Sequence, residues 1–583
     1  MNTTANSLDP ITSELIKNAL DALVDEMALT LVRTAYSSNL KNAMDLSAAV
    51  CDAEGQLIAQ GLTLPLHLGS VPEFMRAVIA KFGGKMCDGD IYITNDPYEG
   101  GSHLPDMYLC KPIFLDYSTP IAFVVCIAHH TDIGGKTPGG NGCDATELYQ
   151  EGLRIPLLKL YDKGEANQTV FDFIARNVRI PRQVLGDLRA ELACLHVGQE
   201  GVQALFEKYG AAQLSAYFAE LLNYAERTAK AEIDALPDGT YSFTDYLDDD
   251  GIDPDPIPIT VSITIAGDQM TIDFTDSSPQ VRGGINCPLS FTQSTAYACV
   301  RCLMGADVPN NGGYFRPITV IAPEGTIVNP LAPGPVAARG LTGFRIANVV
   351  FGALAQAAPE RVPACEIGGD TGVSIGGYER IVQDGKTELR GFVFLEFLYG
   401  SWGGRSDKDG IDGAASSVVN FSNNPAEVLE VELPLRIESY SYLPDTGGAG
   451  IYRGGLSLVR DFRLLAEEAT LQIRADRTKY QPYGLQGGSA GAPSQNILNP
   501  DGDASELPPK PTLTIQRGDV FRHIAAGAGG WGSPFEREPQ AVLKDVLEEK
   551  VSLAHARDTY GVVINPQTYK VDEIATKQLR ATE

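Results

Sequence analysis

The start of the chain carries a helical pattern of apolar and polar positions. Its apolar residues recur at near-helical spacing, at Ile11, Leu15, Leu20, Leu23, Met27 and Leu31. Asp9 can accept backbone hydrogen bonds as an N-cap residue, and Pro10 suits the first helical position because no backbone N–H is needed there. The pattern therefore predicts a long amphipathic helix that begins at Pro10.

From Asp45 onward, the spacing of apolar residues becomes that of strands and then of helices again. Helical spacing returns between about residues 170 and 235. We therefore expect residues 1–236 to form an N-terminal α+β domain. Strands are predicted within residues 46–60, as a hairpin around an acidic glycine turn, and at residues 90–94 and 121–128.

The rest of the chain is predicted to be mostly β-structure. Alternating apolar residues on either side of Ala266-Gly267-Asp268 predict a hairpin, and a polar, proline-rich stretch at residues 499–511 predicts an exposed loop. The expected units are a mainly β middle domain at residues 237–400, a glycine-rich β region at 401–538 and a helical segment at 539–583 that begins at Pro539. The fold class predicted is α+β and multidomain, with mixed β-sheets, flanking helices and glycine-rich loops.

Composition and charge narrow the range of functions. The chain has 583 residues, 44% of them hydrophobic, and a formal net charge of −28, which repels nucleic acids and anionic membrane surfaces. The longest apolar run, residues 121–128, is too short to span a membrane, and the first 20 residues carry no targeting signal. Ten irregularly spaced cysteines are typical of reduced thiols. We expect a cytoplasmic protein that binds neither nucleic acid nor membrane.

Three of only seven histidines fall close together, at His103, His129 and His130. His103 and Asp106 share a glycine- and proline-containing loop, so their side chains are expected to converge. His129 and His130 end a predicted strand. Imidazole and carboxylate groups together suit zinc, manganese or iron(II), and such a set leaves a coordination position open for water. The alternative is that these are loop histidines that form structural hydrogen bonds.

Four other motifs carry less chemical information. The Gly135-Lys136-Thr137 sequence lacks the earlier glycine and the following helix of a phosphate-binding loop. A Gly-x-Ser-x-Gly match at residues 487–491 is expected to be a glycine turn, and the Cys-x-x-Cys at residues 299–302 is expected to hold buried thiols. The acidic run at residues 248–255 lacks the spacing of a calcium loop, so a solvated turn is expected.

Several ordered motifs, taken together, give the sequence a family resemblance. It resembles the hydantoinase B family from about Asp9 to Val563. The motifs that carry the resemblance are Asn95-Asp96-Pro97-Tyr98, Gly100-Gly101-Ser102-His103-Leu104-Pro105-Asp106, His129-His130-Thr131-Asp132-Ile133-Gly134-Gly135, Glu151-Gly152-Leu153-Arg154-Ile155-Pro156, Arg316-Pro317-Ile318, Ala322-Pro323-Glu324-Gly325, Tyr452-Arg453-Gly454-Gly455, Gly527-Ala528-Gly529-Gly530-Trp531-Gly532 and Tyr560-Gly561-Val562-Val563.

This resemblance implies a B-type subunit of an ATP-dependent enzyme that opens cyclic amides such as hydantoins, oxoproline or lactams. A partner A-type subunit would bind ATP with magnesium and phosphorylate the carbonyl oxygen of the substrate. The two would form a hetero-oligomer, with two copies of each subunit as one arrangement. Mapped onto this sequence, the divalent metal site of the family comprises Asp45, His103, Asp106 and one of two adjacent histidines, for which we choose His129 over His130. Zinc is the first choice of metal, with manganese and iron as alternatives.

Further roles follow from the same resemblance. His130 or Asp132 is the expected proton-transfer partner, because both lie next to the predicted ligands. Arg154 and Arg316 are candidate substrate-binding residues for a phosphate or carboxylate group, with structural ion pairs as the alternative. Two other functions stay open: a subunit of an acetone- or acetophenone-type ketone carboxylase, and a scaffold without catalytic residues that caps the A-type subunit.

Overall fold

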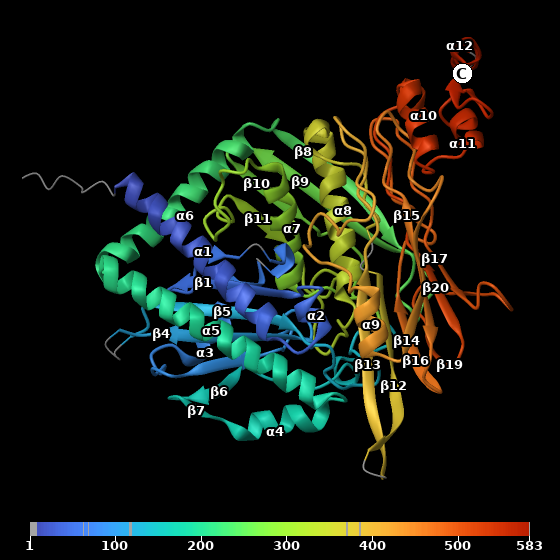
Figure 1. Ribbon diagram of the computed structural model, residues 1–583. Helices are drawn as coiled ribbons and strands as arrows, with labels where there is room; N and C mark the ends of the chain where they lie inside the picture. Colours follow the sequence, from blue (N-terminus) through green and yellow to red (C-terminus); the bar gives the residue numbers. More distant parts are fainter. Residues whose placement is uncertain are drawn as a thin grey trace, which may run out of the picture.

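The computed structural model describes residues 9–61, 63–67, 69–115, 119–368, 371–383 and 386–581. Its elements follow the chain from the N-terminal helix and sheet, through a second sheet, to two β-sheets and a small helical unit at the C-terminal end (Figure 1). This arrangement confirms the predicted multidomain α+β class. No helix within the described ranges has the length and apolar character that crossing a membrane requires.

The N-terminal unit is a seven-stranded sheet with helices packed on both faces. Helix α1 spans Pro10–Thr34, and the carboxylate of Asp9 caps it by accepting hydrogen bonds from the backbone N–H groups of Ile11 and Thr12, as predicted. The predicted hairpin is confirmed as the antiparallel pair β1 (Leu46–Asp52) and β2 (Leu57–Gln60). The sheet order is β2-β1-β5-β4-β3-β6-β7, with β3 at Ile91–Thr94, β4 at Asp106–Ile113, β5 at Ala122–His129, β6 at Leu158–Asp162 and β7 at Glu165–Ala166.

Strand β5 is buried on both of its faces. Val124 and Cys126 belong to the core that α1 and the later helices cover, whereas Val125 and Ile127 face a second core shared with the middle of the chain. A strand buried on both sides is apolar along its whole length, which explains the continuous apolar run at residues 121–128. The helices of this unit are α2 (Ser38–Lys41), α3 (Ser70–Phe82), α4 (Gln168–Asn177), α5 (Pro181–Tyr209) and α6 (Ala211–Asp234).

The middle of the chain forms a four-stranded sheet with two helices. The hairpin predicted around Gly267 is confirmed, because β9 and β10 pair across it. The mainly β expectation for this region omitted α8 (Arg339–Ala357); the other helix of the region, α7 (Leu289–Leu303), contains residues 299–302. Helix α8 packs on β8 and β9 and is buried along almost its entire length. The sheet order is β11-β10-β9-β8, with β8 at Gly239–Leu247, β9 at Ile257–Ala266, β10 at Gln269–Asp273 and β11 at Ile318–Ile321.

Two further sheets enclose an apolar core in the last part of the chain. Their orders are β13-β12-β16-β19 and β14-β15-β20-β17-β18, so the first sheet continues across residue 400, where a domain boundary was expected. The long β12–β13 hairpin projects from the body (Figure 1). The strands are β12 (Thr371–Gln383), β13 (Lys386–Leu398), β14 (Leu435–Leu443), β15 (Ser457–Leu464), β16 (Glu468–Arg474), β17 (Gln495–Leu498), β18 (Ser505–Leu507), β19 (Thr512–Gln516) and β20 (Val520–Ile524), with α9 at Ala426–Glu432.

Closely packed glycine loops join these sheets to the C-terminal helical unit. A Cβ atom on Gly454 would lie 1.9 Å from the carbonyl oxygen of Ala528, so this loop admits no side chain there. The predicted helix at Pro539 is confirmed. The C-terminal unit comprises α10 (Pro539–Leu547), α11 (Leu553–Asp558) and α12 (Glu573–Arg580), with a short hairpin of β21 (Ile564–Asn565) and β22 (Lys570–Val571).

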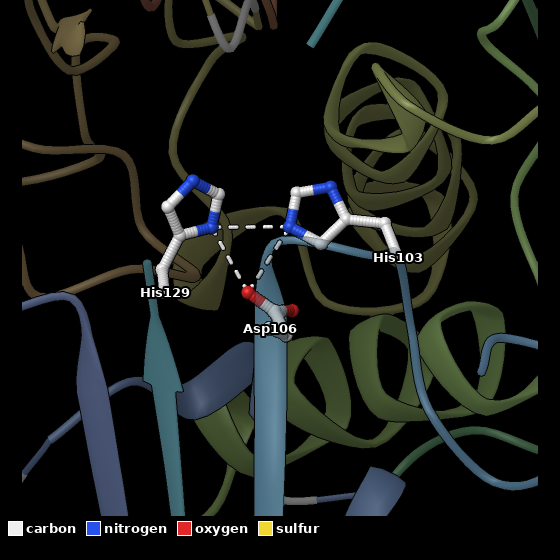
Figure 2. Close-up of side chains that lie close together, drawn as sticks. All are labelled: His103, Asp106 and His129. Atoms are coloured by element: carbon white, nitrogen blue, oxygen red, sulfur yellow. Dashed lines mark hydrogen bonds and ion pairs between the residues drawn. The ribbon is translucent and has the colours of Figure 1, made fainter. Parts of the chain in front are cut away.

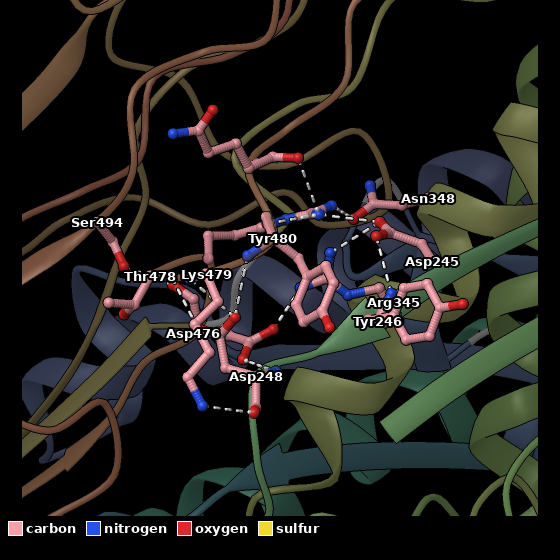
Figure 3. Close-up of polar contacts among 12 residues, drawn as sticks. Asp245, Tyr246, Asp248, Arg345, Asn348, Asp476, Thr478, Lys479, Tyr480 and Ser494 are labelled. Carbon is pink, nitrogen blue, oxygen red and sulfur yellow. Dashed lines mark hydrogen bonds and ion pairs between the residues drawn. The ribbon is translucent and has the colours of Figure 1, made fainter. Parts of the chain in front are cut away.

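A buried network of charged groups holds the middle sheet against the later sheets (Figure 3). Asp476, which follows β16, forms ion pairs with Arg345 of α8 and with Lys510. Asp248, which follows β8, accepts hydrogen bonds from the backbone N–H groups of Thr478 (2.7 Å) and Lys479 (3.0 Å). Segments more than 100 residues apart in sequence are thereby fixed to one another.

Three local expectations were wrong in part. The acidic run at residues 248–255 is not a solvated turn throughout, because Asp248 and Asp250 are buried and hydrogen-bonded. The stretch at residues 499–511 contains β18 and the buried Lys510. Of the two thiols at residues 299–302, Cys299 is buried but Cys302 is exposed.

Candidate metal centre

Three predicted ligands converge on one point at the ends of two inner strands of the N-terminal sheet. Figure 2 shows the rings of His103 and His129 facing one another above the carboxylate of Asp106. The Nε2 atom of His103 lies 3.0 Å from both Oδ1 of Asp106 and Nδ1 of His129, and that Nδ1 atom lies 2.9 Å from Oδ1 of Asp106. All three side chains are buried.

The strands themselves produce this convergence. Asp106 is the first residue of β4 and His129 is the last residue of β5, and the antiparallel register places them directly opposite one another. The loop before β4 then brings His103 to the same end of these two strands. Gly101 keeps this loop close to its neighbours, since a Cβ atom there would lie 2.7 Å from the carbonyl oxygen of Asp96.

The contacts of the two rings show which nitrogen atom of each ring faces the centre. Nδ1 of His103 lies 3.0 Å from the carbonyl oxygen of Ala337 and can only donate to it, so its Nε2 atom carries a lone pair in the neutral ring. Nε2 of His129 has no hydrogen-bond partner within the described residues, so Nδ1 provides its contact with the cluster. Lone pairs and a carboxylate oxygen packed within 3.0 Å repel one another unless a proton or cation lies between them.

This donor set fits a metal ion. The ligand atoms of His103, Asp106 and His129 all lie within 4.8 Å of one another. A tetrahedral ion with bonds of about 2.1 Å separates its donors by about 3.4 Å, so these atoms need to move only a few tenths of an ångström. Two imidazoles and a carboxylate match the ligand preferences of zinc, manganese and iron.

Asp45, the fourth predicted ligand, lies beside the same cluster. Its Oδ2 atom is 3.7 Å from Nδ1 of His129, and its carbonyl oxygen accepts a hydrogen bond from the backbone N–H of His129 (3.1 Å). All four residues chosen from the resemblance are therefore neighbours.

Arg339, which the sequence analysis did not identify, balances the charge of Asp106. Its Nη2 atom lies 2.6 Å from Oδ2 of Asp106, and its guanidinium group stacks on the ring of Phe291. Burial alone would raise the pKa of Asp106, but His103 and Arg339 beside it hold the pKa well below its usual range. The carboxylate therefore stays ionised.

His67, which the sequence analysis also missed, lies on the other side of Asp106. Its Nδ1 atom contacts the hydroxyl of Ser47 (3.0 Å), and its Nε2 atom lies 3.8 Å from Oδ2 of Asp106 and has no hydrogen-bond partner among the described residues. Burial lowers the pKa of His67 to about 4, so the ring is neutral at neutral pH.

A small cavity of about 20 Å³ adjoins this group of residues, with room for about one water molecule. Its wall is mostly apolar and aromatic, and two guanidinium groups interrupt it. The lining residues are Asp45, Leu64, Leu66, His67, His129, Phe291, Arg339, Phe344, Phe397, Val419, Phe421 and Arg474. The cavity therefore has no room for bulk water, and the charged side chains of Asp45, Arg339 and Arg474 form part of its wall.

The two predicted proton-transfer residues lie elsewhere. Nε2 of His130 lies 3.0 Å from Oε2 of Glu191 in α5, because successive side chains at a strand end point to opposite faces. Asp132 accepts hydrogen bonds from the backbone N–H (2.6 Å) and guanidinium group (2.9 Å) of Arg179. The structure does not bring either residue into the metal cavity.

The two predicted anion-binding arginines are also held in ion pairs away from the cluster. Nε of Arg154 lies 2.6 Å from Oδ2 of Asp96. Arg316 contacts Glu226 (3.0 Å) on α6 and the side chain of Gln56. Both arginines therefore form structural ion pairs, which was the alternative to binding a substrate anion.

Comparison with known proteins gives this geometry a family context. The sequence profile of the family described as Hydantoinase B/oxoprolinase matches residues 9–534. The chain belongs to this family. It is 34% identical to the B-type component of a putative D-/L-hydantoinase from Pseudomonas sp. (strain NS671), over 100% of this chain and 99% of that protein. It is also 34% identical to the beta component of the caprolactamase from Pseudomonas jessenii, over 99% of this chain and 100% of that protein.

Other members of the Hydantoinase B/oxoprolinase family are longer proteins. The chain is 27% identical to 5-oxoprolinase 1 of Arabidopsis thaliana over 91% of its own length, but it spans only 42% of that protein. Among solved structures, the ATP-dependent caprolactamase of Pseudomonas jessenii matches with a TM-score of 0.90 and 32% identity, over 99% of this chain and 100% of that one. A nucleotide-free acetone carboxylase shares the fold, with a TM-score of 0.90 at 20% identity, over 98% of this chain and 83% of that one.

Proposed function

We propose that this chain is the metal-binding B-type subunit of an ATP-dependent cyclic amide hydrolase that opens a hydantoin, oxoproline or lactam ring. The observation that carries the proposal is the convergence of two imidazoles and a carboxylate within 3.0 Å in a buried site. The names of its relatives support the substrate class, because they include a hydantoinase, a caprolactamase and 5-oxoprolinases.

His103, Asp106 and His129 would hold the metal, with Asp45 as a fourth ligand. When bound, a divalent ion of this kind supplies Lewis acidity and lowers the pKa of a coordinated water toward about 7. Ala337 and Arg339 keep the ligands in place, the first by accepting a hydrogen bond from His103 and the second by pairing with Asp106.

The other side chains around the cavity have roles that follow from their contacts. His67 presents its Nε2 atom to the cavity and is positioned to accept a proton and return it to a leaving nitrogen. This role falls to His67 because the contacts of His130 and Asp132 direct those side chains elsewhere. The aromatic wall, which includes Phe397, keeps bulk water from the metal ligands.

The proposal also requires a partner. An A-type subunit that binds ATP with magnesium would phosphorylate the carbonyl oxygen of the amide and form a hetero-oligomer with this chain. Two relatives that match along their whole length are named as single components of larger enzymes, which supports this division. In 5-oxoprolinase 1, where this chain accounts for 42% of the length, the remaining part has room for the companion function.

The test combines this chain with its companion ATP-binding subunit and supplies ATP with a lactam, a hydantoin or 5-oxoproline. We expect ring opening that depends on ATP and is lost in His103→Ala, while His196→Ala, which alters an exposed histidine on α5, keeps full activity. Consumption of acetone with bicarbonate, but of no cyclic amide, would instead identify a ketone carboxylase. Full activity of His103→Ala would identify a scaffold.

A further inference from the structure

A single residue, Asn39, is bonded to two of the proposed metal ligands. Its side-chain amide donates a hydrogen bond to the carbonyl oxygen of His129 (2.7 Å), and its own backbone carbonyl accepts one from the N–H of Asp45 (3.3 Å). The backbone N–H of His129 donates in turn to the carbonyl oxygen of Asp45 (3.1 Å). These three bonds link the three residues in a closed ring. Only 3% of Asn39 is exposed, so water does not compete for its bonds.

The segment that carries Asn39 is itself held from two sides. Helix α2 is four residues long, and a helix this short is not stable by itself. At its start, the buried carboxylate of Asp187 on α5 accepts a hydrogen bond from the backbone N–H of Ser37 (2.9 Å). On another side, the hydroxyl of Ser38 donates to Oδ1 of Asn424 (2.7 Å), which follows the β12–β13 hairpin. The position of Asn39 is therefore fixed by contacts with α5 and with the later part of the chain.

The backbone that leads into Asp45 is also strained. Met44, the residue before it, has a φ of +60°, which is a left-handed conformation that residues other than glycine rarely adopt. Such a conformation costs free energy and persists only where the surrounding structure determines the backbone. The segment that ends at Asp45 is therefore held in one conformation by its contacts.

The amide of Asn39 has a cost as well as a use. Its Oδ1 atom is buried and has no hydrogen-bond partner among the residues that the structure describes. A buried polar atom without a partner lowers stability, and an apolar side chain of the same size would avoid this cost. What such a side chain would lack is the hydrogen bond from the amide nitrogen to His129.

We propose that Asn39 is a positioning residue of the metal centre, which keeps His129 and Asp45 in place for the ion. The inference rests on the proposed function, because it presupposes that the cluster binds a metal. Asn39 is not itself a ligand, since its amide nitrogen is bonded to the backbone of His129 and its side chain does not line the metal cavity. It acts on the backbone of the two ligands, and thereby on the direction in which their side chains point.

The test measures the zinc affinity of the full chain by competition with a chelating indicator, without substrate or partner subunit. Asn39→Leu keeps the size of the side chain and removes the donor, and Asn39→Ala does the same without a branched side chain if the leucine prevents folding. We expect both to bind zinc at least tenfold more weakly than the wild type, as is typical when a group that supports a metal ligand is lost.

The matched control is Asn329→Leu. Its amide nitrogen also donates to a backbone carbonyl, that of Ala322 (2.9 Å), but in the middle of the chain. We expect its zinc affinity to stay within about threefold of the wild type, because neither residue belongs to the metal cluster.

Two further readouts separate positioning from a general loss of structure. The melting temperatures of the metal-free wild type and variants should agree within about 3 °C, because one hydrogen bond is a small part of the stability of 583 residues. The visible absorption spectrum of the cobalt(II)-loaded protein reports the arrangement of the ligands. We expect this spectrum to change in Asn39→Ala and to stay the same in Asn329→Leu.

The inference is overturned if both Asn39 variants bind zinc as tightly as the wild type, or if Asn329→Leu loses as much affinity as they do. A larger fall in the metal-free melting temperature, with an unchanged cobalt spectrum, overturns it too, because the role is then only structural. A wild type that binds no zinc overturns it together with the metal centre.

Ring opening with the partner subunit is measured separately. Unchanged zinc affinity of the Asn39 variants, in a system that opens the ring, contradicts this inference alone. Weakened zinc affinity of the variants, in a system that opens no ring, contradicts the proposed function alone.

Discussion

Replacement of Asp245 by asparagine is expected to weaken the attachment of the middle sheet to the later sheets. Oδ2 of Asp245 lies 2.8 Å from Nη1 of Arg345 and 2.9 Å from Nη1 of Arg477, and the residues of the first pair are labelled in Figure 3. Burial opposes ionisation, but Arg345 and Arg477 lower the pKa of Asp245 from 3.8 to about 2. Only 8% of Asp245 is exposed, so solvent screens these pairs little.

The magnitude of the effect follows from the pKa difference. At about 1.36 kcal/mol per pKa unit, the ionised form contributes roughly 2.4 kcal/mol to the free energy of unfolding at pH 7. The neutral asparagine side chain would also leave two buried guanidinium groups with less compensation, so we expect a loss of about 3 kcal/mol. With an unfolding entropy of about 2.1 cal/mol/K per residue, a chain of 583 residues that unfolds cooperatively loses about 2 °C in melting temperature.

The sign of the pH dependence is fixed, because the pKa of Asp245 is lower in the folded state. The stabilisation is present above pH 3.8 and is lost as the pH falls toward 2, so the gap between wild type and Asp245→Asn narrows to about half at pH 3. Differential scanning calorimetry at pH 7 and pH 3 measures this gap. The control is Asp253→Asn. The ion pair of Asp253 with Arg282 is half exposed, so this substitution should change the free energy of unfolding by less than about 0.5 kcal/mol. Equal melting temperatures of the two variants at pH 7, or an unchanged gap at pH 3, would refute the reasoning.

Three further substitutions test the metal centre. Arg339→Met leaves the charge of Asp106 uncompensated, so we expect the metal-free protein to lose about 3–5 kcal/mol of stability. Adding zinc should then raise the melting temperature of the variant more than that of the wild type, as measured by differential scanning fluorimetry. An equal rise in both proteins would contradict this expectation. Gly101→Ala forces a Cβ atom against the backbone and should reduce metal content by at least half in elemental analysis. Gly502→Ala, whose Cβ atom would approach no other atom more closely than 4.0 Å, should leave the metal content unchanged. Equal metal contents of the two variants would contradict the role of the loop. His67→Gln should retain the metal and lower kcat about 100-fold, and an unchanged kcat would remove its role in proton transfer.

Local patterns in the sequence were sufficient to predict the helices and hairpins that local interactions stabilise. The helix from Pro10 and the hairpin around Gly267 are set by capping and by alternation of side chains, and both were predicted correctly. The convergence of His103 with Asp106 could also be predicted, because they lie three positions apart in a rigid loop. Pairing of Asp106 with His129 could not be predicted, because it depends on strand β4, which the sequence analysis did not identify, and on its register with β5.

The residues that the sequence analysis did not identify are brought to their places by contacts between distant segments. Arg339 lies 233 residues from Asp106 in sequence, and no local pattern links them. His67 stands alone in an apolar stretch without any motif around it. The burial of Asp248 could not be predicted either, since its partners lie about 230 residues further along the chain. Such residues are identified only when packing brings the segments together.

The most direct test of the account is the metal content of the purified protein, prepared without chelators and measured by elemental mass spectrometry. The wild type is compared with His103→Ala, Asp106→Ala and the surface control His196→Ala. We predict about one zinc, manganese or iron per wild-type and control chain, and its loss in the two cluster variants. Absence of metal from the wild type, or full retention in both cluster variants, would contradict the claim that this cluster is a metal centre.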